Sequence, residues 1–327
     1  MYVKNYIQIY LWKVLSLLTG FLSLVLVIPE ISNNQELYGI YAFTISLSLY
    51  FTYADIGFIS SGQKFASEEY AKNEHLEENN ILGFTTAVMF CMFIPMTIIF
   101  LFFSYFPSLV FKDLSLQSSS VASGLFMILG TLIPLQVILQ RTLLMILSIR
   151  LLDYISIRID IVFNFIKILS IFYFFTEDRY MIVEYFLFST LVTILGSLIG
   201  FFYVRYRVNF KLWMLIKAVK ISKVYYLKTK GLAFASAAIT IGFTLFYELD
   251  LIIVGFLFGA KEVAIFAIAF TFISFFRRLW SIIYSPISVR LNHFVGLNSK
   301  EDIVELLNSV IYYTFPLCII TSVALLL

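Results

Sequence analysis

The stretch ILGFTTAVMFCMFIPMTIIFLFFSYF, residues 81–106, decides the fold class of this chain. It contains no acidic or basic side chain, and polar and apolar residues do not alternate along it. A helix of about 20 apolar residues crosses the hydrocarbon core of a bilayer, which is about 30 Å thick. Inside that core every backbone N–H and C=O must be bonded within its own segment or within a closed barrel. The stretch therefore predicts a helix that spans a membrane.

The whole chain has the same character. Of its 327 residues 61% are hydrophobic and 13% are charged, whereas a soluble domain is about 45–50% apolar and about 25% charged. The net charge of +3 is too small to indicate a nucleic-acid-binding protein. Two cysteines, Cys91 and Cys318, provide neither a disulfide framework nor the spacing of metal ligands. We expect an all-α integral membrane protein that is not an enzyme and uses no cofactor.

Eight further stretches are long and apolar enough to span a bilayer. With residues 81–106 the nine predicted spans are 7–28, 38–60, 81–106, 119–149, 155–175, 181–203, 232–257, 262–290 and 304–327. Lysine and arginine orient such helices, because cytoplasmic loops hold an excess of them. With the N-terminus inside, fifteen of the 23 lie on the cytoplasmic side, three on the opposite side and five within spans. This asymmetry predicts a cytoplasmic N-terminus, and the acidic residues of loop 61–80 are expected to be solvated.

An internal repeat divides the chain. A shift of 225 residues aligns 39–43 with 264–268 and the first three spans with the seventh, eighth and ninth. Because this shift keeps the direction through the membrane, it predicts two parallel-repeat bundles. Between them the lysines and apolar residues of 204–231 alternate at helical spacing, which predicts a basic amphipathic helix on the anionic inner leaflet.

Three domains are therefore expected. They are a six-helix bundle at 1–203, the cytoplasmic linker 204–231 and a partial second bundle of three helices at 232–327. The chain ends at Leu327 within an apolar run. We expect a truncated chain that lacks the end of its second bundle, and a natural nine-span protein is the alternative.

Four short segments resemble a known family. LYGIY (37–41) and ADIGF (54–58) form a first signature, and DLIIVG (250–255) and AIFAIA (264–269) form a second. Together they are similar to the repeat signatures of bacterial O-antigen and polysaccharide flippases, members of the multidrug/oligosaccharidyl-lipid/polysaccharide exporter superfamily. The similarity in layout covers essentially the whole chain. It departs from the family at Ala264, where a glycine is usual, and in having fewer than twelve spans.

The resemblance implies a place in polysaccharide or lipopolysaccharide biosynthesis. The substrate would be an undecaprenyl-diphosphate-linked oligosaccharide, such as an O-antigen or capsule repeat unit. It would cross the bacterial inner membrane by alternating access. The expected partners are this lipid-linked oligosaccharide, the bilayer and a coupling proton or sodium ion, and no nucleic acid.

Charged side chains within spans indicate where a substrate would bind, because each costs at least about 2.5–3.5 kcal/mol at the centre of a helix. The candidates for a lumen wall are Arg277, Arg278, Arg141, Lys167 and Asp55. Arginine and lysine suit a diphosphate, and the 225-residue shift places Asp55 one turn from Arg277. Arg141 reaching the inner interface and Lys167 pairing with a carbonyl or Asp160 are the alternatives. Glu248 and Asp250, near the outer end of span 232–257, are candidates for ion coupling.

Two other functions compete with the flippase. A drug/cation antiporter of the same superfamily would need an acidic lumen, whereas the buried charges here are mainly basic. A membrane glycan polymerase or ligase would resemble its class in having a large outer loop. The longest outer loop expected here is only 107–118. The flippase is therefore the leading hypothesis.

Overall fold

The computed structural model describes residues 2–54, 57–111, 114–150, 152–176, 179–247, 249–271, 273–274 and 300–326. They belong to two compact units, Met1–Ile268 and Ala269–Leu327. The helices of the first unit are α1 (Tyr2–Ile31), α2 (Gln35–Tyr53), α3 (Phe58–Ala71), α4 (His75–Tyr105), α5 (Leu116–Ile149), α6 (Asp153–Phe174), α7 (Ile182–Arg207), α8 (Leu212–Ala218), α9 (Lys223–Tyr247) and α10 (Leu249–Phe258). A single 3-10 turn (Pro107–Leu109) follows α4, residues 260–271 are also helical, and the second unit contains α12 (Lys300–Leu326).

Five helices among the described residues are long and apolar enough to cross a membrane. They are Leu11–Ile31, His75–Tyr105, Leu116–Ile149, Ile182–Arg207 and Ile303–Ile320. Each overlaps one of the nine predicted spans. Large apolar side chains are exposed on these helices: the exposed fraction is 62% for Ile98 and 60% for Phe202. An apolar surface of this kind suits a helix that is surrounded by lipid. The predominantly helical class is confirmed, and the five long apolar helices are compatible with a membrane protein.

The predicted span 38–60 is wrong at its C-terminal end. Helix α2 begins where the Asn34 side chain accepts a hydrogen bond from the N–H of Leu37, and it ends at Tyr53. Gly57 then adopts a left-handed conformation with φ of 72°, which only glycine enters without strain. The chain turns there, and α3 starts at Phe58.

The predicted solvated loop 61–80 is wrong in part, although Glu68 and Glu74 are exposed as expected. Most of it is helix, because α3 continues to Ala71 and α4 begins at His75. Asn73, with φ of 63°, lies in the turn between the two helices, and asparagine tolerates this region better than most residues. Glu69 and Glu78, expected in solvent, are buried instead.

The connection between the predicted bundles is more helical than the sequence indicated. Helix α7 extends to Arg207, and α9 begins at Lys223 rather than at the predicted 232. Between them α8 is a short helix that buries Leu215 and Ala218 and leaves Lys217 exposed. The predicted domain boundaries at 203 and 232 stay a prediction.

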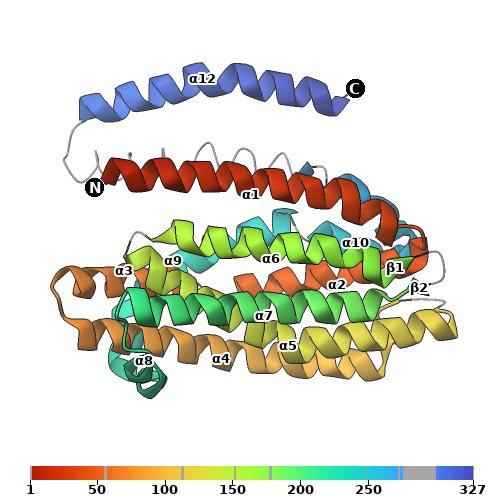
Figure 1. Ribbon diagram of the computed structural model, residues 1–327, viewed down its shortest axis with the longest axis horizontal. Helices are drawn as coiled ribbons and strands as arrows, with labels where there is room; N and C mark the ends of the chain where they lie inside the picture. Colours follow the sequence, from red (N-terminus) through yellow and green to blue (C-terminus); the bar gives the residue numbers. More distant parts are fainter. Residues whose placement is uncertain are drawn as a thin grey trace. The chain divides into compact units, whose positions relative to one another are not determined.

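Helix α5 is the centre of the first unit, where it packs against α4, α7 and α2. Helix α1 lies along α6, while α3 packs against both α4 and α9. In Figure 1 the turn between α3 and α4 lies with α8 at one end of these helices, and the hairpin of β1 (Phe175–Thr176) and β2 (Arg179–Tyr180) lies at the other. At the hairpin end the Tyr180 hydroxyl donates a hydrogen bond to the carbonyl oxygen of Ile31.

Candidate functional site

Four of the predicted site residues, Asp55, Glu248, Arg277 and Arg278, lie outside the described residues, together with most of the predicted span 262–290. The lumen wall that they would form stays a prediction. The other three lie on different helices. Arg141 is half-buried on α5, Lys167 is half-buried on α6, and Asp250 is exposed on the first turn of α10.

Lys167 has partners on its own helix. Its Nζ is 3.5 Å from Oδ1 of Asn164, and it interacts electrostatically with Asp160. Seven residues separate Asp160 from Lys167, which places them two turns apart on one face of α6. The arrangement agrees with the alternative to substrate binding, in which Lys167 pairs with Asp160. A role of Lys167 in the lumen stays a prediction.

The helices that hold one segment of each signature, α2 and α10, pack against each other in the structure. A Cβ atom at Gly39 of α2 would lie 1.7 Å from the carbonyl oxygen of Ala260, and one at Gly255 of α10 would lie 2.4 Å from the Phe43 ring. The rings of Phe43 and Phe256 are 6.1 Å apart between centroids and meet edge to face. Small residues let helix backbones approach this closely. The glycines of both signatures therefore form a close crossing between α2 and the segment that contains α10.

A third signature glycine fixes another helix pair. Besides its left-handed backbone, Gly57 leaves no room for a side chain, because a Cβ atom there would lie 2.3 Å from the carbonyl oxygen of Ala233 in α9. Next to this contact Phe58 of α3 and Phe84 of α4 form an apolar cluster with Ala233. Helices α3, α4 and α9 are thus packed together by apolar groups directly beside a set of charged ones.

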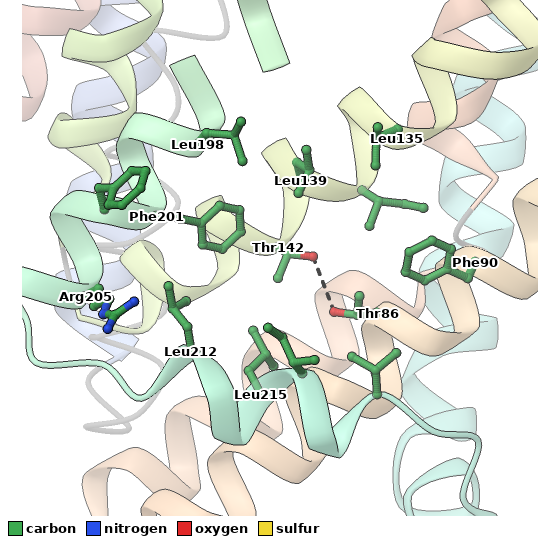
Figure 2. A pocket seen from close by; sticks show the side chains of 14 residues that line it. Thr86, Phe90, Leu135, Leu139, Thr142, Leu198, Phe201, Arg205, Leu212 and Leu215 are labelled. Carbon is green, nitrogen blue, oxygen red and sulfur yellow. Dashed lines mark hydrogen bonds between the residues drawn. The ribbon is translucent and has the colours of Figure 1, made fainter. Parts of the chain in front are cut away.

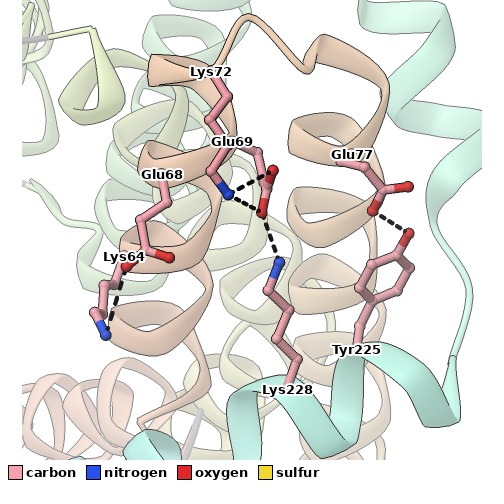
Figure 3. A network of polar contacts seen from close by, with 7 residues as sticks. All are labelled: Lys64, Glu68, Glu69, Lys72, Glu77, Tyr225 and Lys228. Carbon is pink, nitrogen blue, oxygen red and sulfur yellow. Dashed lines mark hydrogen bonds and ion pairs between the residues drawn. The ribbon is translucent and has the colours of Figure 1, made fainter.

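We call that set the polar clamp, which consists of Glu69, Lys72, Glu77, Tyr225 and Lys228 (Figure 3). Nζ of Lys228 on α9 lies 2.8 Å from Oε1 of Glu69 on α3, and Nζ of Lys72 lies 3.3 Å from the same oxygen. The Tyr225 hydroxyl donates to Oε2 of Glu77 over 2.8 Å. Helix α9, which begins in the predicted linker and continues into the predicted second bundle, is therefore held by two polar contacts to helices of the first.

The electrostatics of the clamp favour its ionised form. Hydrogen bonds from Lys228 and then from Lys72 lower the pKa of Glu69, against the opposing effect of burial. The pKa of Tyr225 is raised, chiefly by burial and then by its hydrogen bond to the Glu77 carboxylate. Glu69 is thus a carboxylate and Tyr225 a neutral donor at neutral pH, which is the pairing that the geometry requires.

A more deeply buried ion pair lies at the same end of the unit. Nη2 of Arg150, just after α5, is 2.7 Å from Oε1 of Glu78 on α4, and their side chains are 7% and 0% exposed. The other Glu78 oxygen is 3.2 Å from Nδ1 of His75. The guanidinium also lies over the rings of Tyr70 and Phe210, 4.6 and 4.9 Å from their centroids. This pair ties the start of α4 to the end of α5.

No family model, curated protein or solved structure matches this chain. Its function is therefore inferred from its own residues and contacts. Sequence reasoning missed both the clamp and the Arg150–Glu78 pair, because it assigned their acidic members to a solvated loop. Lys72 and His75, three residues from Glu69 and Glu78, were the local signal, whereas Lys228, Tyr225 and Arg150 come from parts of the chain that local reasoning does not connect to these carboxylates.

The lowered pKa of Glu69 makes a pH-dependent contribution to stability. A carboxylate with a depressed pKa stabilises the fold above its unfolded value, here 4.5, and loses that contribution as the pH falls through the folded value. We expect Glu69→Gln to lower the midpoint of thermal unfolding at neutral pH, and the difference from the unmodified protein to shrink below pH 4.5. Glu68→Gln is the matched control, because its 3.7 Å contact with Lys64 is exposed. A difference that is independent of pH would contradict the assignment of Glu69 as the charged member.

Proposed function

We propose that this protein is a flippase, which moves an undecaprenyl-diphosphate-linked oligosaccharide such as an O-antigen or capsule repeat unit across the bacterial inner membrane. The observation that carries the proposal is the close packing of α2 against the segment that contains α10, at the glycines of the two signatures. Gly39 and Gly255, one from each, lie in one close helix crossing. In an alternating-access transporter built of two bundles, residues at such a crossing stay in contact while the bundles tilt.

In this proposal the polar clamp is the gate that opens to admit the substrate. Its Lys228 side chain is 33% exposed, so water can replace its contact with Glu69 when α9 separates from α3, while Lys72 stays beside Glu69 at the end of α3. Under the proposed topology, with the N-terminus inside, the clamp lies on the cytoplasmic side. The structure then corresponds to a state closed to the cytoplasm, and the substrate would enter from the cytoplasm after the clamp opens.

The charges within the membrane helices fit an anionic substrate better than a cationic drug. Arg141 on α5 and Lys167 on α6 are proposed as basic residues of the lumen wall, and Arg277 and Arg278 are proposed to extend the same wall together with Asp55. Glu248 and Asp250 are proposed for coupling to a proton or a sodium ion. The two parallel-repeat bundles belong to the same proposal.

Surface polysaccharide in a deletion strain tests the proposed function. The strain lacking the gene should lose high-molecular-weight surface polysaccharide on a gel, and expression of the chain should restore it. Undecaprenyl-linked repeat units should accumulate on the cytoplasmic side of the mutant. Intact surface polysaccharide in the deletion strain would contradict the proposal, and altered susceptibility to cationic drugs would then favour the antiporter.

Reversal of one clamp charge tests the gate. We expect Glu69→Lys to reduce polysaccharide export severalfold, because it places a like charge 2.8 Å from the present position of the Lys228 amine. Lys228→Glu in the same chain should restore much of the export by re-forming the pair in reverse. The control is the reversal Lys64→Glu with Glu68→Lys on the exposed face of α3. Normal export with Glu69→Lys alone would exclude the clamp as a gate.

A further inference from the structure

A cavity of about 650 Å³ lies between α4, α5 and α7, with α8 across one end (Figure 2). Its walls are phenylalanine, leucine, isoleucine and valine side chains, apart from Thr86, Thr142 and Arg205. The hydroxyls of Thr86 and Thr142 are 3.3 Å apart, and that of Thr86 also bonds to the carbonyl oxygen of Leu82. The threonines therefore satisfy one another, and the cavity offers a ligand an apolar wall and one cation.

The cavity has the shape of a slot along the helices. Leu198 and Arg205, both in its lining, are seven residues apart on α7, which is about 10 Å along the helix axis. Phe90 and Phe202 line it while 45% and 60% exposed, so one side opens outward from helices that are long and apolar enough to span a membrane. In a bilayer this opening faces acyl chains.

The residues around the α8 end are basic and have no acidic neighbours in the sequence. Between Glu184 and Glu248 the chain contains no aspartate or glutamate. Five exposed basic residues lie in the last turn of α7 and in or next to α8: Arg205, Arg207, Lys211, Lys217 and Lys220. None of them belongs to an ion pair among the described residues. An anionic group is the complement of this surface.

We propose that this cavity binds one anionic phospholipid of the surrounding bilayer. An acyl chain lies in the slot between α5 and α7, and the phosphate meets the Arg205 guanidinium, which can donate two parallel hydrogen bonds to phosphate oxygens. Helix α8 buries Leu215 and leaves Trp213 and Lys217 exposed, as expected of an amphipathic helix at the headgroup level. The site does not depend on the flippase function, because the bilayer itself supplies the ligand.

Native mass spectrometry of the full chain in detergent tests this proposal. Phosphatidylglycerol and phosphatidylcholine with identical acyl chains are added separately, and the fraction of protein that retains one lipid is compared. We expect preferential retention of phosphatidylglycerol. Arg205→Gln should weaken that retention about tenfold, as for loss of a charge-assisted hydrogen bond. Leu139→Trp, which fills the slot, should lower retention of both lipids.

Two controls separate this site from general charge and surface effects. Lys230→Gln removes an equal charge from the exposed face of α9, outside the cavity, and should leave retention unchanged. Leu169→Trp adds an equal ring at a 63% exposed position on α6 and should do the same. Because Arg205 is exposed, Arg205→Gln should fold normally, which the unfolding midpoint will verify.

Equal retention of the two lipids, or equal effects of Arg205→Gln and Lys230→Gln, would overturn the proposal. Competition with undecaprenyl phosphate distinguishes a phospholipid from a polyprenyl lipid as the occupant of the cavity. If that lipid displaces phosphatidylglycerol at a lower concentration and Leu139→Trp abolishes its retention, the cavity holds a polyprenyl chain and the assignment to a phospholipid is wrong.

Discussion

Replacement of Arg150 by methionine is expected to lower the midpoint of thermal unfolding by about 10 °C. The Glu78 carboxylate is 0% exposed and 2.7 Å from the guanidinium, so the substitution leaves a buried charge without its main partner. Removing one member of a buried pair typically costs about 3–5 kcal/mol, and each kcal/mol shifts the midpoint of a domain this large by about 2–4 °C. The measurement is thermal unfolding of the purified protein in detergent.

The double variant distinguishes a buried pair from a surface one. Glu78→Leu combined with Arg150→Met removes both charges, and it should recover much of the lost stability because no uncompensated charge remains. Lys64→Met is the matched control, because its partner Glu68 is 46% exposed, and it should shift the midpoint by less than about 3 °C. Equal shifts for Arg150→Met and Lys64→Met would show that water reaches Glu78.

Replacement of Gly39 by valine is expected to abolish export and to reduce the amount of folded protein in the membrane severalfold. The first side-chain carbon would lie 1.7 Å from the carbonyl oxygen of Ala260 and 2.7 Å from its carbonyl carbon. These are backbone atoms, so no rotamer change can relieve the overlap, and α2 must move away from the segment after α10. Overpacking of this kind costs about 1–3 kcal/mol where side chains can adjust, and more where they cannot.

Gly20→Val provides the comparison for Gly39→Val. Gly20 lies within α1, one of the five helices long and apolar enough to cross a membrane, but a Cβ atom there meets nothing within 4 Å. Immunoblots of membrane fractions and size-exclusion profiles should therefore show near-normal Gly20→Val protein and little Gly39→Val protein. Equal accumulation of the two variants would contradict the close crossing of the signatures.

The sequence predicted five of the nine spans as helices long and apolar enough to cross a membrane, because the bilayer imposes a requirement on each segment separately. Length and apolar composition are local properties, so stretches such as 81–106 and 181–203 are recognisable without knowledge of their neighbours. The same reasoning failed at 38–60, where Gly57 breaks an otherwise apolar run. That glycine was the available signal, because an isolated glycine in such a run indicates a bend or a close approach.

The polar contacts were beyond local reasoning for a different physical reason. The composition around Glu69, Glu77 and Glu78 is that of a solvated acidic loop. Only the packing of α9 against α3 and α4 brings Lys228 to Glu69 and Tyr225 to Glu77, and only the packing of α5 against α4 brings Arg150 to Glu78. For the predicted lumen, the cost of placing a charge in a membrane made Arg141 and Lys167 candidates for the lumen wall. In the structure both side chains are half-buried. This cost does not determine which way a charged side chain points, because the side chains of adjacent helix residues point about 100° apart around the axis.

The clamp also has a consequence for biogenesis. Lys228 follows Glu69 by 159 residues, so at about 5–20 residues per second the ribosome needs about 8–32 s between them. Arg150 follows Glu78 by 72 residues (150 − 78) and emerges in less than half that time. The nascent chain thus joins α4 to α5 before α9 exists, and Lys72 is the partner within reach of Glu69 during the interval.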